Sequence, residues 1–303
     1  KIDLSAAKVE YSESGALRLT AGSADSDALK VFAHENNTFK GAEVLLDSAG
    51  GLIFADEAPI KVEASSGKVV LKGQAIDLKS GSSVKARDEA VVRGYESLVL
   101  GDKISVEGCS VSVTGGKQAF SLGNNVSLTA TNGGIEVLAD ADATLGGSLN
   151  VNASLKDPSA GDEAPIRIGA QGVLNVTEDE FEVIAENGSV DIFGGNDLHI
   201  KKDLTIVSAS DSSLTSERGL IDIGKNATVK AGTQSGLSQG SYGKVSVIAG
   251  DSFTIGEDAQ ILSDDLLVSA QKDIRFGDKA TLVGATDGVT VRSSEGSIYM
   301  GED

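Results

Sequence analysis

A nine-residue pattern that recurs along the chain constrains its fold more than any other feature. Residues 253–261 read Phe-Thr-Ile-Gly-Glu-Asp-Ala-Gln-Ile, and residues 274–282, 21 positions later, read Ile-Arg-Phe-Gly-Asp-Lys-Ala-Thr-Leu. Two apolar residues separated by one residue indicate a short strand with one face turned inward, and Gly with two polar residues indicates a corner. A third alternating pair, Leu266 and Val268, lies between the copies. The pattern therefore predicts a rung of three short strands and three corners.

The same rung can be followed along nearly the whole chain through the apolar pair that marks its first strand. The predicted markers are Ile2/Leu4, Leu29/Val31, Leu52/Phe54, Ile76/Leu78, Leu98/Leu100, Phe120/Leu122, Ala143/Leu145, Ile166/Ile168, Val190/Ile192, Ile221/Ile223, Phe253/Ile255, Ile274/Phe276 and Ile298/Met300. A fixed period of roughly 21–25 residues without helical stripes is typical of a parallel β-solenoid, in which each rung closes the open edge of its neighbour.

We predict a single all-β domain over residues 1–303, a right-handed parallel β-helix (β-solenoid) of about 13 rungs with three short strands each. Right-handedness is favoured because left-handed coils need a six-residue period. Helices are disfavoured because stripes of period 3.6 are missing. A β-sandwich would not require the same corner in every rung.

Gly follows the first strand at many of these corners, for example at Gly101, Gly123, Gly256 and Gly277. Gly tolerates a positive φ, so we expect it to supply the sharp turn between two strands. The Asn124 and Asn125 side chains are expected to form ladders between rungs at the same kind of corner.

The net charge and the composition limit the classes of binding partner that we expect. The net charge of −19 disfavours nucleic acid and anionic lipid, which are polyanions that require a basic patch. The single cysteine, Cys109, excludes an internal disulfide and is expected to be a free structural thiol. Apolar runs are too short for membrane insertion, and the sequence shows no signal peptide. The chain begins with Lys1 rather than Met and stops just after a strand pattern, so we expect a piece of a larger exported protein.

Three segments break the period and are predicted to be loop insertions, near residues 156–164, 208–219 and 232–243. Insertions in solenoids map to loops that often lie on the binding face. The candidate interaction residues in them are Asp157, Asp162, Glu163, Asp211, Glu217, Arg218, Gln239 and Tyr242. A tolerated insertion without function is the alternative for each segment.

Residues suited to catalysis or metal binding do not form a recognisable motif. His34 lies in a polar stretch and His199 is expected to point outward from a strand, which disfavours a zinc site or a catalytic triad. Acidic pairs such as Asp25/Asp27, Asp140/Asp142 and Asp264/Asp265 could place carboxylates together, but 45 acidic residues on repeated corners do so by chance. The chain approaches the calcium-binding solenoid repeat at a single place, residues 194–198, whereas such sites need several stacked copies. We predict no catalytic, cofactor or metal residues, with incidental calcium on acidic corners left open.

The rung at residues 274–282, with relatives at residues 98–106 and 221–229, resembles repeats of secreted bacterial β-helix proteins, the class of filamentous haemagglutinins and autotransporter passenger domains. This resemblance in repeat style implies export and display at the bacterial cell surface, associated with the outer membrane. A targeting cap and a translocator barrel would have to lie outside this sequence.

Three functions follow as hypotheses. The first is a non-enzymatic extracellular stalk or adhesin that attaches to a host-cell, matrix or neighbouring-cell ligand. The second is a structural subunit that self-associates into an extracellular filament or surface layer, because solenoid ends carry unpaired strand edges. The third is a polysaccharide-degrading β-helix enzyme, which the scarcity of aromatic residues makes the weakest.

Overall fold

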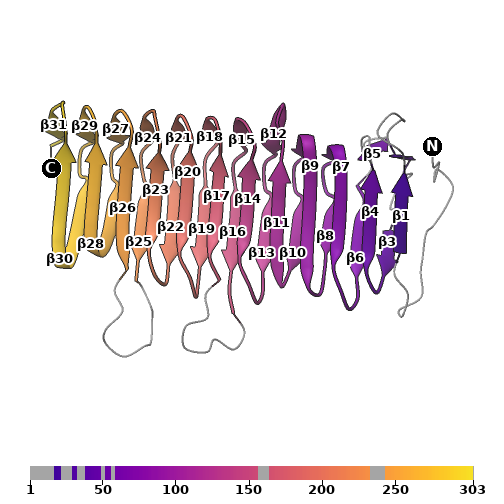
Figure 1. Cartoon of the computed structure of the whole chain (residues 1–303). Helices are drawn as coiled ribbons and strands as arrows, with labels where there is room; N and C mark the ends of the chain where they lie inside the picture. The colour runs from indigo at the N-terminus through magenta and orange to yellow at the C-terminus, as the bar shows by residue number, and fades with distance from the viewer. Residues whose placement is uncertain are drawn as a thin grey trace.

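The computed structural model describes residues 17–21, 29–32, 38–48, 52–55, 59–155, 164–232 and 243–302, and in these residues every regular element is a β-strand. The strands stack in parallel into a solenoid whose turns follow one another along a single axis, with β1 near one end and β31 at the other (Figure 1). The predicted all-β parallel solenoid is thereby confirmed. The described residues contain no helix of the length and apolarity that a membrane span requires.

Strand pairing sorts the elements into three columns. The first column is made of β2 (Leu29–Phe32), β5 (Leu52–Ala55), β12 (Ala119–Leu122), β15 (Ala143–Leu145), β18 (Leu174–Val176), β21 (Leu198–Ile200), β24 (Ile221–Ile223), β27 (Phe253–Ile255), β29 (Ile274–Phe276) and β31 (Ile298–Met300). The second column is made of β3 (Thr38–Gly41), β6 (Lys61–Ala64), β8 (Ser83–Lys85), β10 (Ser105–Gly108), β13 (Ser127–Ala130), β16 (Leu149–Ala153), β19 (Phe181–Ala185), β22 (Leu204–Ser208) and β25 (Thr228–Ala231).

The third column contains β1 (Leu17–Ala21), β4 (Val44–Ser48), β11 (Ser110–Gly115), β14 (Ile135–Ala139), β17 (Ile166–Ala170), β20 (Val190–Gly194), β23 (Ser212–Ser216) and β26 (Lys244–Ala249). Four longer strands bend through a corner and serve two columns. They are β7 (Val69–Leu78) and β9 (Glu89–Leu100), which join the third column to the first, and β28 (Gln260–Ala270) and β30 (Thr281–Ser293), which join the second to the third.

Each strand pairs with the strand one turn earlier and one turn later in its own column. In the second column ten successive pairings run from β3 to β30, so the described residues form about ten turns. Strand β14 illustrates why these short segments are stable only together. Its Ile135, Val137 and Ala139 are buried while Glu136 and Leu138 face outward. Three inward side chains on one strand are stabilised only when neighbouring turns cover them.

Two of the predicted first-strand markers belong to a different column. Ile166/Ile168 and Val190/Ile192 lie on β17 and β20 of the third column. The first column at these turns is formed by β18 and β21, which pair with each other through Leu174 and Leu198. All three strands of a turn carry the same apolar alternation, so the alternation alone does not distinguish the columns. The marker Ile2/Leu4 lies outside the described residues.

The prediction of a loop insertion at residues 208–219 is wrong. Strand β23 occupies the middle of this segment and pairs in register with β20 and β26. Its inward positions are Ser212, Leu214 and Ser216, all buried. The two serines interrupt the apolar alternation, so the sequence pattern does not indicate a strand here. Both hydroxyls have hydrogen-bond partners: the Ser212 and Ser208 hydroxyls are 2.8 Å apart, and the Ser216 hydroxyl donates to the carbonyl of Asn196. The predicted insertions at 156–164 and 232–243 lie mostly outside the described residues.

The last described turn leaves part of its inward-facing surface open. Ile298 and Met300 continue the buried row of the first column, yet they are 46% and 60% exposed. In the preceding turn the equivalent residues, Ile274 and Phe276, are buried. The difference shows that each turn relies on the next one for its apolar cover.

Candidate functional site

The corner between the first and second columns, here called the first corner, carries the most regular polar chemistry of the molecule. In eight turns a residue one or two positions before the second-column strand has a positive φ between 50° and 63° although it is not Gly. These residues are Lys103, Asn125, Ser148, Glu180, Asp203, Asn226, Asp258 and Lys279. Left-handed backbone at ordinary residues costs about 1–2 kcal/mol each, so the stacked turns impose this conformation.

The glycines of the first corner have a different role from the predicted one. Gly101, Gly123, Gly256 and Gly277 are not among the described residues with positive φ. They are required by close approach: a Cβ on Gly123 would lie 2.7 Å from the carbonyl carbon of Gly101, one turn earlier. Each corner glycine thus packs against the backbone of the previous corner. Gly supplies space here rather than conformational freedom.

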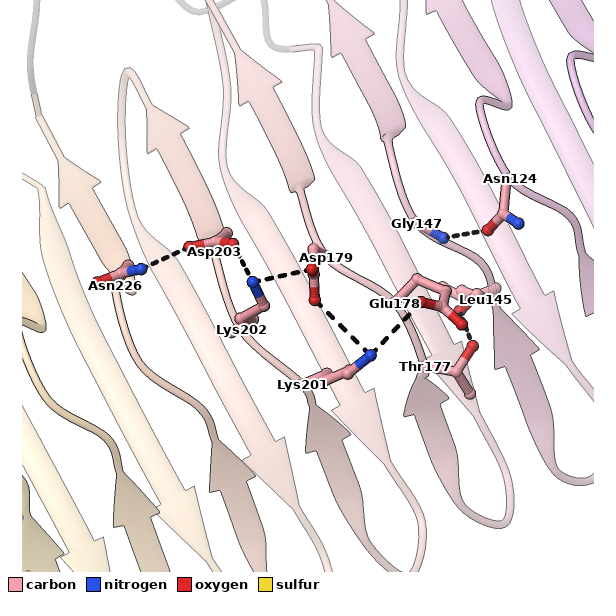
Figure 2. Close-up of polar contacts among 10 residues, drawn as sticks. All are labelled: Asn124, Leu145, Gly147, Thr177, Glu178, Asp179, Lys201, Lys202, Asp203 and Asn226. Atoms are coloured by element: carbon pink, nitrogen blue, oxygen red, sulfur yellow. Dashed lines mark hydrogen bonds and ion pairs between the residues drawn. The ribbon is translucent and has the colours of Figure 1, made fainter.

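Side chains at this corner also bind the backbone of the following turn. The Asp102 carboxylate accepts a hydrogen bond of 2.7 Å from the backbone N–H of Asn124. One turn later the Asn124 side-chain oxygen accepts a bond of 2.8 Å from the Gly147 N–H (Figure 2). The predicted ladder role is confirmed for Asn124, whereas Asn125 is one of the positive-φ residues. These bonds satisfy corner N–H groups that no strand ladder reaches.

A charged network replaces the glycine ladder where β18 leads into β19 and β21 leads into β22 (Figure 2). Thr177 and Lys201 stand at the positions that Gly fills in other turns. The Lys201 ammonium lies 3.4 Å from the Glu178 carboxylate and 3.8 Å from Asp179, and the Lys202 ammonium lies 2.8 Å from Asp179. Lys side chains of one turn therefore bind acidic side chains of the turn before.

The network extends one turn further through Asp203. The Lys202 ammonium lies 3.3 Å from the Asp203 carboxylate, and the Asn226 side-chain amide donates a bond of 2.7 Å to the same carboxylate (Figure 2). Bonds to Asp179 and Asp203 raise the pKa of Lys202 above its usual value. The bond from Asn226, followed by that from Lys202, lowers the pKa of Asp203. Both groups remain charged at neutral pH, and the network fastens three turns together.

The acidic pairs singled out by the sequence have structural partners. Asp142 accepts a bond of 2.7 Å from the Val173 N–H, and Asp265 lies 3.0 Å from the Lys244 ammonium. Asp197, in the calcium-like segment, accepts a bond of 2.8 Å from the Leu220 N–H. Asp264 differs, because it is buried and its Oδ2 has no hydrogen-bond partner in the described part of the chain. Among the described residues, no group of three or more His, Cys, Asp or Glu is arranged to hold a metal ion.

His199 and Cys109 each lie beside a group of a neighbouring turn. His199 lies on the outer face of β21, as predicted, with its Nδ1 4.0 Å from the Asp222 carboxylate one turn later. Cys109 is a free thiol whose Sγ donates to the Arg87 carbonyl at 2.9 Å. His34 and the pair Asp25/Asp27 lie outside the described residues.

Three of the eight candidate interaction residues are described, and they lie at the two ends of β23. The Asp211 carboxylate accepts a bond of 2.8 Å from the Lys244 N–H, which gives it a role in the next turn. Glu217 and Arg218 are exposed at the far end of the strand. Asp157, Asp162, Glu163, Gln239 and Tyr242 lie outside the described residues.

A lateral groove of about 460 Å³ is the concave feature that the sequence did not predict. It crosses the outer side of the third column at the beginnings of β9, β11, β14, β17 and β20. Four charged residues line the groove, Glu89, Glu136, Arg167 and Asp191. The other lining residues are apolar or small: Val111, Ile135, Ile166, Pro165, Gly134, Ser110, Ser112 and Ser189. These residues come from five turns, so their proximity follows from strand register and not from sequence spacing.

The fold and its surface define the class: this chain is a parallel β-solenoid protein whose turns are joined by apolar stacking inside and polar bonds at the corners. Beyond that class, comparison with known proteins adds nothing, since no family model, no curated protein and no solved structure matches the chain.

Proposed function

We propose that this chain is a non-enzymatic extracellular stalk or adhesin that carries an attachment surface along a rod. About ten described turns at the usual strand spacing of about 4.8 Å give a rod on the order of 50 Å. The observation that supports a spacer role is the chain of cross-turn bonds from Glu178 through Lys202 and Asp203 to Asn226, which ties the turns laterally. The resemblance in repeat style to haemagglutinin and autotransporter passengers supports surface display.

The same proposal includes a right-handed coil, a single domain over residues 1–303 and about 13 rungs, one for each predicted first-strand marker, Ile2/Leu4 included. Right-handed crossovers between parallel strands are strongly favoured because the strand twist is right-handed. Calcium on the acidic corners is incidental in this proposal.

An adhesion assay tests the proposal directly. Surfaces coated with the chain are expected to retain bacteria, epithelial cells or matrix proteins above the level of albumin-coated surfaces, and soluble chain in excess is expected to compete. A screen of acidic and neutral glycans for turnover runs in parallel. Retention equal to albumin, or turnover of one glycan, contradicts the proposal.

The contribution of Asp211, Glu217 and Arg218 is tested by substitution, because deleting residues 208–219 would remove β23 and its buried Leu214. Asp211→Asn keeps an acceptor for the Lys244 N–H. The triple variant with Glu217→Gln and Arg218→Gln is expected to reduce retention if these residues touch the ligand. Unchanged retention with an unchanged circular dichroism spectrum removes the attachment role from this end of β23.

The alternative is a structural subunit of a filament or surface layer, in which parallel strands of successive copies pair end to end. In this alternative a second copy of the chain covers Val289, Ile298 and Met300, which lie in inward-facing rows of the last described turn. Sedimentation velocity at high concentration would then show association that Ile298→Lys and Met300→Lys abolish, and a strict monomer contradicts it.

A further inference from the structure

The lateral groove offers carboxylates that the fold itself leaves unused. Glu89 and Glu136 are exposed on its rim, and neither carboxylate has a hydrogen-bond or ion-pair partner in the part of the chain that the structure describes. This contrasts with the first corner, where Glu178, Asp179 and Asp203 are bonded to lysines. The rim therefore keeps two negative charges available.

The only described cation lining the groove is already engaged. Arg167 Nε lies 3.2 Å from the Asp191 carboxylate, and its guanidinium lies 4.9 Å from the centroid of the Phe193 ring. The Ser213 hydroxyl donates to the other oxygen of Asp191. Arg167 is thus held toward β20 and away from Glu136, although Glu136 and Arg167 are direct neighbours in register.

Shape and surface character point to an elongated ligand. Small residues, Ser110, Gly134 and Ser189, form one side of the groove, and a Cβ on Gly134 would lie 2.6 Å from the Pro165 carbonyl. Five turns at about 4.8 Å per step make the groove roughly 19 Å long. Lysine and arginine carry an apolar stem below a charged head, and they match a groove that is lined by Pro165 and other apolar residues and carries carboxylates on its rim.

We propose that this groove binds an extended basic peptide segment of a partner protein, with lysine or arginine heads on Glu89 and Glu136. The inference rests on the proposed attachment function and names the class of ligand. Glu89 and Glu136 belong to β9 and β14, two turns apart, so their backbones are separated by roughly 10 Å along the axis. An extended peptide covers that distance in about three residues at 3.3 Å per residue. The net charge of −19 steers such a partner toward the rod.

The experiment uses the full chain and a fluorescent peptide with two lysines three positions apart in a Gly/Ser background, followed by anisotropy at low ionic strength. Glu89→Gln/Glu136→Gln is expected to weaken binding about threefold to tenfold, because each exposed ion pair contributes modestly. Glu257→Gln/Glu302→Gln is the matched control, since both residues are exposed and far from the groove along the chain. An equal loss in the control pair overturns the groove assignment, because only the overall charge would then matter.

A variant that is expected to strengthen peptide binding provides a second test. Arg167→Gln removes the partner of Asp191 and adds an available carboxylate, so it is expected to tighten peptide binding about twofold to fivefold. Unchanged or weaker binding overturns the proposed site. Preference for neutral oligosaccharide over the lysine peptide overturns the ligand class.

The two proposals fail in distinguishable ways. If peptide binding depends on Glu136 but coated surfaces retain no cells, the attachment function is contradicted and the groove remains supported as a peptide-binding site. If surfaces coated with the wild-type chain and with the Glu89→Gln/Glu136→Gln variant retain cells equally, the attachment function is supported and the groove is ruled out as the attachment site.

Discussion

Gly256 lies against the backbone of Gly224 in the preceding turn, so closely that a Cβ on Gly256 would be 2.7 Å from the Gly224 carbonyl carbon and 2.6 Å from the Lys225 nitrogen. Backbone atoms cannot move aside as a flexible side chain can. The contact repeats at Gly277 against Gly256, where the distance to the carbonyl carbon is 2.5 Å. The spacing of the solenoid at the first corner therefore depends on a column of glycines.

Gly256→Ala is expected to lower the free energy of unfolding by about 1–3 kcal/mol, because the added methyl group forces two turns apart. Urea denaturation followed by circular dichroism measures the change. Thr281→Ala, an exposed position on β30, serves as the control and is expected to change stability by less than about 0.5 kcal/mol. A loss of the same size in both variants would contradict the close-approach explanation.

Lys103 tests the positive φ of the first corner, since it has φ of 56° and its side chain is exposed. Lys103→Val is expected to destabilise the chain by about 1–2 kcal/mol, because a β-branched side chain is strained in the left-handed region. Lys103→Gly is expected to be neutral or slightly stabilising, since relief of strain offsets the entropy of Gly. The opposite ranking of the two variants would show that the corner does not hold this conformation.

Leu214 tests whether residues 208–219 form a strand of the solenoid. Its side chain is fully buried on β23, so Leu214→Ala is expected to cost about 2–5 kcal/mol. The neighbouring Thr215→Ala, on the outer face, is expected to cost far less. Equal, small effects of both substitutions in urea denaturation would indicate that residues 208–219 form a loop, as the sequence pattern predicts.

The stability of the chain at acidic and basic pH follows from the groups whose pKa values are shifted. Asp273 has a pKa below its usual value of 3.8, first because it accepts a bond from the Ser297 N–H and then because of Arg275, and the pKa of Asp203 is also lowered. Their stabilisation is complete above pH 3.8 and is lost as the pH falls through the lower folded-state pKa. Lys202 has a pKa above 10.5, so its contribution is present below that pH and disappears as the pH rises through the folded-state pKa.

The urea midpoint measured between pH 2 and pH 12 checks this expectation. It should be flat across the neutral range and fall at both extremes, by small amounts because these groups are exposed to solvent. Asp273→Asn should flatten part of the acidic limb. A midpoint that instead changes steeply near pH 6–7 would contradict the expectation.

Much of the architecture could be predicted from the chain alone, and the errors have two physical causes. Alternating pairs such as Phe253/Ile255 and Ile274/Phe276 predict stacked parallel strands, since the inward face must be apolar in every turn. The same alternation is shared by all three columns, so Ile166 and Val190 were placed in the wrong one. Strand β23 was missed because Ser212 and Ser216 satisfy their hydroxyls inside the solenoid, which leaves Leu214 as the only apolar inward residue.

The repeat, the strand content, the polar corners and the acidic composition can be predicted from the amino-acid sequence, because each depends on residues close together along the chain. Which strands stack is visible only in the folded chain, because stacking depends on the register between residues about 20 to 30 positions apart. Register brings Glu136 beside Arg167 and Asp191, and it makes Gly256 meet Gly224. The groove exists for the same reason: its carboxylates are distant in sequence and become neighbours only when the turns are stacked.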